Sequence, residues 1–385
     1  MKKIAVVTAT RAEYGLLAPV IRELRQREDD SLKVELIVTG THLSEQYGQT
    51  VLDIDQRIDR RISIPVNSET ELDISKNQAE ALCLFTELFI KEKYDAVMVL
   101  GDRYETLAIA IAAGNTRIPV FHLCGGDTTE GAMDEWIRHC ITKISYLHFV
   151  TNEQSRKRVI QLGENPERVF NYGSTSIDNI HSVANMGKAE ALNSIGLADC
   201  RYALCTFHPV TMEENDAYNQ IAALLAAIRA FPELQFVVTG ANADCGGARI
   251  NELWESAAKS ESNLHVFASL GVRRYLSLMR HAEFVLGNSS SGVIEAPALR
   301  TPTVNIGDRQ RGRLTSASVV NCGYGTAEIV SAVRRAVSKE HRALCCSVIS
   351  SYGDGHAAER IAEKAIEVVL TGHIDLKKRF YDNKR

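Results

Sequence analysis

The stretch AVMVLGDRYETLAIAIAAGNTRIPVFHLCGGD, residues 96–127, decides the fold class of this chain. It begins with a short apolar run, passes through a turn into a longer apolar segment, and ends in a second apolar run. We interpret it as strand, turn, helix and strand, with both strands apolar throughout, as in a buried parallel sheet. This is the unit from which doubly wound α/β folds are built.

The same alternation of strands and helices runs through the rest of the chain. Residues 3–10 and 33–40 are expected strands, and residues 11–29 between them carry apolar side chains at the spacing of an amphipathic helix. The pattern restarts with the strand YALCTFHP at 202–209. We therefore predict two Rossmann-like doubly wound parallel-sheet domains, 1–178 and 179–364, followed by the end of a helix and a basic tail, 365–385.

Composition excludes several classes of protein. With 385 residues and 45% hydrophobic residues, the chain is long enough for two domains with real cores. The formal net charge of −4 argues against nucleic acid or an anionic membrane as a partner. No apolar run approaches the roughly 20 residues of a membrane helix. Nine cysteines without a CxxC motif indicate a reduced, cytoplasmic protein.

Ligands of doubly wound folds bind at the carboxyl ends of the strands, so the residues that follow each strand are the candidates for a site. Arg11 is expected at the first turn of a helix, where an arginine and the helix N-terminus together can bind an anion. The alternative is an ordinary surface arginine near a helix cap. Asp102 faces the same edge or is an N-cap. His208 is a ligand or a structural histidine. Asn242 and Asp244 also follow a strand.

The segment LGNSSSGVIEAPAL, residues 286–299, is more specific. Hydroxyls and backbone N–H groups at a helix start can cradle a phosphate, which points to Ser289, Ser290, Ser291 and Gly292. Glu295, one turn later, suits the two hydroxyls of a ribose. The segment NIGDRQRGR, residues 305–313, adds three arginines, some of them candidate ligands and the others a solvated basic loop.

The segment HLCGGDTTEGAMDEWIRH, residues 122–139, gathers acidic side chains after a strand. A Gly-Gly turn precedes them, and acids at a strand end are candidates for general acid–base chemistry. The alternative is a solvated helix start with ion pairs at i, i+4 spacing, Asp134 with Arg138 and Glu135 with His139. A metal site would need His122, Asp127 and His139, whose spacing matches no standard pattern, so we expect no metal there.

Six motifs in register give the chain a strong resemblance to a known family. They are TATRAEYG (8–15), LGDRYE (100–105), HLCGGDTTEGAMDEWIRHCITKISYLHF (122–149), FHPVT (207–211), GNSSSGVIEAP (287–297) and NIGDRQRGR (305–313). Together they resemble the hydrolysing UDP-N-acetylglucosamine 2-epimerases of sialic acid biosynthesis. The resemblance implies a GT-B fold with the active site in a cleft between the two domains. It also implies that the C-terminal helix and tail cross back to the first domain.

The resemblance also assigns roles to residues. It implies catalytic carboxylates at Asp102, Asp127 and Asp134, a less securely aligned one at Glu130, and a histidine near the diphosphate at His208. It implies contacts to UDP from Arg11, Ser290, Ser291, Glu295 and Arg313. The non-hydrolysing relatives carry an HVEAG-like segment where this chain has HLCGGD, and a glutamate at the position of Asp134.

The implied reaction converts UDP-GlcNAc and water to ManNAc and UDP through 2-acetamidoglucal. The resemblance leaves open a 2,4-diacetamido-2,4,6-trideoxy sugar on the way to legionaminic acid, and a non-hydrolysing epimerase. A GT-B glycosyltransferase and a sugar-nucleotide-binding domain without turnover are further alternatives. No cofactor is expected, with a divalent cation left open. A UDP-sugar is the expected partner, and the protein is expected to form a homodimer or homotetramer.

Overall fold

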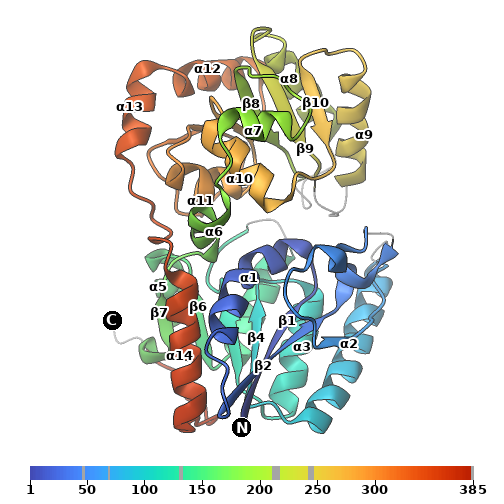
Figure 1. Ribbon diagram of the computed structural model, residues 1–385, viewed down its shortest axis with the longest axis vertical. Coiled ribbons are helices and arrows are strands. Elements are labelled where there is room, and N and C mark those ends of the chain that lie inside the picture. Colours follow the sequence, from blue (N-terminus) through green and yellow to red (C-terminus); the bar gives the residue numbers. More distant parts are fainter. Residues whose placement is uncertain (46–47, 68–69, 130–132, 210–216, 242–246, 383–385) are drawn as a thin grey trace. The chain divides into compact units, whose positions relative to one another are not determined.

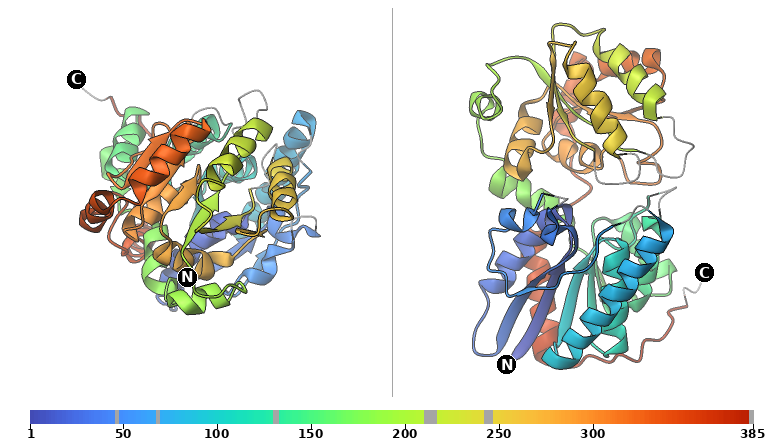
Figure 2. Two further views of the ribbon diagram at one scale, coloured as in Figure 1. Left: turned by 90° about the horizontal axis from the view of Figure 1, so that it is seen from above. Right: turned by 90° about the vertical axis from the view of Figure 1, so that its right-hand side faces the viewer.

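A computed structural model describes residues 1–45, 48–67, 70–129, 133–209, 217–241 and 247–382. Contacts divide the chain into two compact units. The first comprises Met1–Asp127, Met133–Asp178 and Tyr352–Arg385, and the second comprises Thr128–Ala132 and Asn179–Ser351. The ribbon views in Figures 1 and 2 show both units as α/β folds. The expected GT-B fold, built from two Rossmann-like domains, is confirmed.

In the described part of the first unit, seven strands form one parallel sheet in the order β3-β2-β1-β4-β5-β6-β7. The strands are β1 (Lys2–Thr8), β2 (Leu32–Val38), β3 (Arg60–Arg61), β4 (Ala96–Leu100), β5 (Val120–Leu123), β6 (Leu147–Val150) and β7 (Val169–Asn171). The strand order reverses between β1 and β4. Such a switch point is where doubly wound folds bind their ligands.

Helices cover both faces of this sheet (Figure 2), which explains why its strands are apolar on both sides. The helices of this unit are α1 (Arg11–Arg25), α2 (Glu71–Glu92), α3 (Tyr104–Asn115), α4 (Asp134–Ile144), α5 (Glu153–Gln161) and α14 (Ala357–Thr371), with 3-10 turns η1 (Gly40–Leu43), η3 (Thr50–Asp53) and η4 (Pro166–Arg168). In β1, Ile4 and Val6 pack with α1 and α14, whereas Ala5 and Val7 pack with α2, α3 and α4.

The second unit repeats the architecture. Within its described residues, six parallel strands run in the order β10-β9-β8-β11-β12-β13, and the order reverses between β8 and β11. The strands are β8 (Tyr202–Thr206), β9 (Gln235–Thr239), β10 (Leu264–Phe267), β11 (Val285–Gly287), β12 (Thr303–Ile306) and β13 (Val319–Cys322). The helices are α7 (Lys188–Asn193), α8 (Ala217–Ile228), α9 (Gly247–Ala258), α10 (Gly271–His281), α11 (Ser291–Ala298), α12 (Thr326–Ala336) and α13 (Lys339–Ser347), and α6 (Thr175–Val183) connects the two units.

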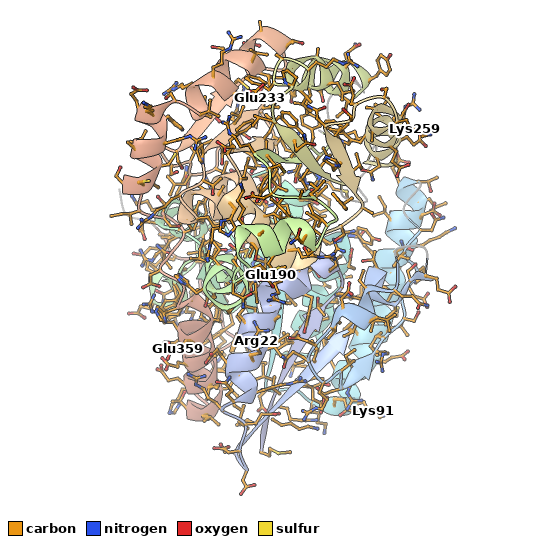
Figure 3. All side chains as sticks on the ribbon, turned by 45° about the horizontal axis from the view of Figure 1, so that its top comes forward. Arg22, Lys91, Glu190, Glu233, Lys259 and Glu359 are labelled. Carbon is orange, nitrogen blue, oxygen red and sulfur yellow. The ribbon has the colours of Figure 1, made fainter. Side chains whose placement is uncertain are left out.

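Helix α14 belongs to the first unit. Its apolar face, including Ile361, Ala365 and Val369, joins the core that contains α1. Figure 1 shows the two helices side by side, and Figure 3 labels Arg22 on α1 and Glu359 on α14. The contacts therefore group residues 352–364 with the first unit, whereas the expected division placed them in the second domain. The reason is that α14 is one continuous helix with its apolar face on α1.

Across the described ranges, no helix combines enough length with enough apolar character to cross a membrane.

Candidate active site

Three candidate residues of the first unit follow neighbouring strands. Arg11 comes after β1, Asp102 after β4 and Asp127 after β5, and these strands are adjacent in the sheet. The carboxyl ends of parallel strands meet at one edge, so this edge carries the candidate residues beside the switch point. Asp102 is not the N-cap of α3, because that position belongs to Arg103. The alternative reading of Asp102 as a cap is therefore wrong.

The side chain of Arg138 connects the acidic residues at this edge. It lies on α4 and is 2% exposed. Its Nε lies 2.8 Å from Oδ2 of Asp102, and its Nη2 donates to the same oxygen. Its Nη1 lies 2.8 Å from the carbonyl oxygen of Asp127 and 3.0 Å from Oε2 of Glu135. One buried guanidinium thus fixes the Asp102 carboxylate and the backbone of Asp127 together.

The carboxylate of Asp127 is held from the opposite side by two hydroxyls. Its Oδ1 accepts hydrogen bonds from Thr151 Oγ1 at 3.0 Å and Ser155 Oγ at 2.6 Å. Gly126 before it has φ +79°, and a side chain there would overlap the backbone of Ser155. The Gly-Gly turn therefore allows the backbone after β5 to approach α5 closely. Thr151 and Ser155 are site residues that the sequence analysis missed, although they too follow a strand, β6.

The first turn of α4 carries further acids. Asp134 is the first residue of the helix, at intermediate burial. Glu135 Oε1 lies 3.2 Å from Nε2 of His139, which is the i, i+4 contact of the alternative reading. Glu135 also contacts Arg138, so its carboxylate belongs to the charged cluster around that guanidinium. Glu130 lies outside the described residues, and its role stays a prediction.

The start of α1 holds a buried carboxylate that the sequence analysis did not select. Thr10 and Glu13 form a capping box, and Glu13 Oε2 accepts from the backbone N–H of Ala9 at 2.8 Å. Burial, and then the neighbouring Glu105, raise the pKa of Glu13 to about 7. Arg11, the first residue of this helix, is exposed. The capping box fixes the backbone from which Arg11 projects.

The alternative metal set is not assembled. His122 is fully buried and its Nε2 lies 2.8 Å from the carbonyl oxygen of Gly101, while His139 contacts Glu135. Burial lowers the pKa of His122 to about 3, so it is neutral at neutral pH. Within the described ranges, no three His, Cys, Asp or Glu side chains are placed to hold a metal ion together.

In the second unit, His208 follows β8, next to the switch point. Its backbone N–H donates to Oδ1 of Asn288 at 2.7 Å, and Nδ2 of Asn288 donates back to its carbonyl at 2.8 Å. Burial, and then Arg309, lower the pKa of His208 to about 3. The imidazole is therefore neutral at neutral pH. Gln310, from the arginine-rich segment, donates to the Asn288 carbonyl at 2.8 Å.

The serine-rich turn after β11 ends a chain of hydroxyl groups. Ser291 Oγ lies 2.6 Å from Oη of Tyr275 and 3.1 Å from Oγ of Ser289. Tyr275 Oη in turn lies 3.4 Å from Thr206 Oγ1 at the end of β8. Of the remaining candidates, Ser290 is the N-cap of α11, Gly292 lies in its first turn, and Glu295 lies one turn further along the helix. Sequence reasoning missed Tyr275, which lies on α10, packs partly buried against the apolar core of the second unit and belongs to none of the motifs.

Three further candidates lie in other segments. Arg313 donates from Nε to the carbonyl of Thr128 at 3.1 Å and from Nη2 to Thr129 Oγ1 at 3.4 Å. It thus contacts the residues that directly follow Asp127. Asn242 and Asp244 lie outside the described residues, and their roles stay predictions.

Comparison with known proteins decides the family. A family model described as UDP-N-acetylglucosamine 2-epimerase matches residues 22–366. The chain belongs to this family. A relative from Campylobacter jejuni, named GDP/UDP-N,N'-diacetylbacillosamine 2-epimerase (hydrolyzing), is 38% identical over 324 residues, which are 83% of this chain and 84% of the relative. The polysialic acid biosynthesis protein P7 of Escherichia coli is 37% identical, covering 96% of this chain and 94% of that protein.

Solved structures of the 2-epimerase family share the fold. The crystal structure of UDP-GlcNAc 2-epimerase from Neisseria meningitidis bound to UDP-GlcNAc has a TM-score of 0.81. It is 21% identical and covers 95% of this chain and 100% of that one. This likeness supports the fold described here.

Proposed function

We propose that this protein is a hydrolysing 2-epimerase that converts UDP-GlcNAc and water to ManNAc and UDP. The observation that carries the proposal is the Arg138 cluster, in which one buried guanidinium holds Asp102 and Asp127 at the ends of adjacent strands. Two fixed carboxylates with different surroundings suit a reaction that removes a proton on one face of a sugar and returns one on the other. The relative from Campylobacter jejuni, named as hydrolyzing, supports the same choice.

The proposed reaction has two steps. The C1–O bond breaks, the electron pair leaves with UDP, and a carboxylate removes the C2 proton, which leaves the C1–C2 alkene 2-acetamidoglucal. Water then adds its oxygen to C1 and gives one proton to a carboxylate, while an acid delivers a proton to the opposite face of C2, giving ManNAc. We assign these proton transfers to Asp102, Asp127 and Asp134 as a group, with Glu130 as a further candidate. Neighbouring carboxylates also stabilise positive charge that develops on the ring.

The second unit and Arg11 would hold the departing UDP. Serine hydroxyls and backbone N–H groups at the start of α11 suit a phosphate, and Glu295 one turn later suits a ribose. The neutral imidazole of His208 can donate a hydrogen bond to the diphosphate without adding a charge. Arg11 and Arg313 would add positive charge, which lowers the barrier to departure of the anionic leaving group.

A second candidate substrate is a UDP-linked 2,4-diacetamido-2,4,6-trideoxy sugar. The name of the Campylobacter jejuni relative, which contains N,N'-diacetylbacillosamine, favours it. The chemistry at C1 and C2 would be identical, and the difference would lie in the pocket for C4 and C6.

The test is incubation of the protein with each sugar nucleotide in D2O, followed by 1H and 31P NMR. Free ManNAc with deuterium at C2, together with UDP, is the result expected from UDP-GlcNAc. Turnover of the 2,4-diacetamido substrate alone would select the second candidate. UDP-ManNAc as product would make the protein a non-hydrolysing epimerase, and no turnover of either substrate would overturn the proposal.

We also propose that the reaction needs no cofactor, since elimination and addition of water move protons and no net electrons. The dependence on a divalent cation is measured by repeating the assay with a chelator and with added Mg²⁺. A loss of turnover with the chelator, restored by Mg²⁺, would contradict the proposal.

A further inference from the structure

The residues after α14 run along the first unit and contact α4, the helix of Arg138. We call Ile374–Tyr381 the C-terminal strap. Within the strap, the Lys378 side chain is 23% exposed and reaches the C-terminal end of α4. Its Nζ lies 3.3, 2.8 and 2.7 Å from the carbonyl oxygens of Thr142, Lys143 and Ser145. A helix leaves its last carbonyls without intrahelical partners, and a cation there is favourable, so Lys378 caps α4.

Lys378 is also part of a buried ion network. Its Nζ lies 2.6 Å from Oε2 of Glu164, whose side chain is 1% exposed. The same oxygen lies 3.0 Å from Nε2 of His148 in β6, and Oε1 lies 2.6 Å from Nζ of Lys143. Burial alone would raise the pKa of Glu164, but His148, Lys143 and Lys378 bring it down to about 2. The network joins the strap, the end of α4 and the central sheet.

Two further contacts hold the strap in register. The backbone N–H of Tyr381 donates to the carbonyl of Gly163 at 2.9 Å. The Phe380 ring covers Gly163, which has φ +86°, and a side chain at Gly163 would overlap that ring. Lys143 Nζ lies 5.1 Å from the centre of the same ring, at cation–π distance. The strap is therefore docked on specific groups of the first unit.

Helix α4 is thus held at two places. Near its start, Arg138 binds Asp102 and the carbonyl of Asp127. At its end, Lys378 binds three carbonyls. Arg138 and Thr142 lie one turn apart on α4. Because a short helix moves as a rigid body, a displacement of its C-terminal end also displaces Arg138.

We propose that Lys378 is a positioning residue that, through the C-terminal end of α4, keeps Arg138 in register with Asp102 and Asp127. The effect on turnover rests on the proposed function. The effect on the order of α4 does not, because it is a property of the folded first unit.

The first experiment compares Lys378→Met with the wild type in the full-length chain. Lys377→Met is the matched control, because the neighbouring Lys377 is exposed. Hydrogen exchange measured by mass spectrometry on peptides covering residues 134–145 should be about tenfold or more faster in Lys378→Met and unchanged in Lys377→Met. We expect kcat to fall about tenfold or more, and KM for the UDP-sugar to change less than twofold. Lys378→Arg retains the cation and should recover most of the loss.

The second experiment truncates the chain after Ile374 and supplies a synthetic peptide of residues 375–385. Slow exchange in α4, and kcat, should both return with the peptide. Wild-type exchange in the Lys378→Met variant would overturn the proposal whatever the activity. Faster exchange with unchanged kcat would also overturn it, because the strap would then stabilise α4 without positioning Arg138. If the wild type turns over no sugar nucleotide, the proposed function fails, and the exchange result still decides whether the strap orders α4.

Discussion

Nε and Nη2 of Arg138 both donate to a single oxygen of Asp102, Oδ2. This arrangement differs from a fork that occupies both carboxylate oxygens. These two bonds leave Oδ1 of Asp102 to other partners. A carboxylate held through one oxygen can use the other as a proton acceptor, so the arrangement agrees with the role proposed for Asp102.

The first prediction concerns this pair. Asp102→Asn should lower kcat by about 100-fold or more, because it removes an ionisable group from the proton transfers. Arg138→Lys should lower kcat comparably, since an ammonium group cannot make the same two bonds to Oδ2. Steady-state turnover and UDP binding by calorimetry check both variants. A Kd for UDP within twofold of the wild type shows that the folded site is intact, and an unchanged kcat in Asp102→Asn would contradict the assignment.

The second prediction concerns the hydroxyls that hold Asp127. Ser155→Ala removes the 2.6 Å hydrogen bond to Oδ1 and should lower kcat about tenfold by freeing the carboxylate to rotate. Ser194→Ala in the second unit is the control, because its hydroxyl donates to a backbone carbonyl of α7. The same turnover assay compares the two variants. Equal activity in both would mean that the orientation of Asp127 does not limit the reaction.

The third prediction concerns the hydroxyl chain of the second unit. Tyr275→Phe keeps the ring but removes the 2.6 Å hydrogen bond to Ser291. We expect Kd for UDP to rise about three- to tenfold, the value of one hydrogen bond, with a smaller change in kcat. Isothermal calorimetry with UDP measures it. A change confined to kcat would place Tyr275 in the chemistry instead of in nucleotide binding.

The fourth prediction concerns the pH dependence of stability. The pKa of Glu13 is about 7 in the folded protein, above its ordinary value, so the folded state binds a proton more tightly than the unfolded state. The contribution of Glu13 is therefore most favourable below about pH 4.5 and is lost as pH rises to about 7, by roughly 3 kcal/mol at most. Glu13→Gln keeps an acceptor for the capping box and cannot ionise. Its melting temperature should exceed that of the wild type by more at pH 8 than at pH 5.

Thermal unfolding monitored by circular dichroism at both pH values checks the fourth prediction. Glu23→Gln on the exposed side of α1 serves as the control, because Glu23 pairs with Arg27 at the surface. A difference between Glu13→Gln and the wild type that stays constant from pH 5 to pH 8 would show that Glu13 does not titrate in this range.

Sequence reasoning located the edge of the sheet better than it located the contacts made there. Asp102 and Asp127 could be selected because each directly follows an apolar strand, and strand ends of a parallel sheet share an edge. The partners of Arg138 could not be derived in the same way. Helical spacing pairs it with residues on its own helix, whereas it binds Asp102, 36 positions earlier. That contact depends on where α4 lies against the sheet, which periodicity does not encode.

The same limit applies to residues that act on the backbone. The basic composition of the tail did not reveal its partners, because Lys378 binds carbonyls that any sequence would offer at the end of a helix. Asn288 likewise binds the backbone of His208, so no pairing of side-chain types reveals it. The pattern of residue types cannot predict such contacts, because the partner is a backbone group that every residue carries.

The two units differ in which stretches of the chain form them. The second is formed almost entirely by one continuous stretch, residues 179–351, whereas the first also needs residues 352–385. During synthesis the ribosome makes the first sheet early but delivers α14 and the strap only after the second unit. The apolar face of α1 therefore stays uncovered while the whole second unit emerges. The second unit can thus complete its core before the first, which reverses the usual N-terminal-first order of folding on the ribosome.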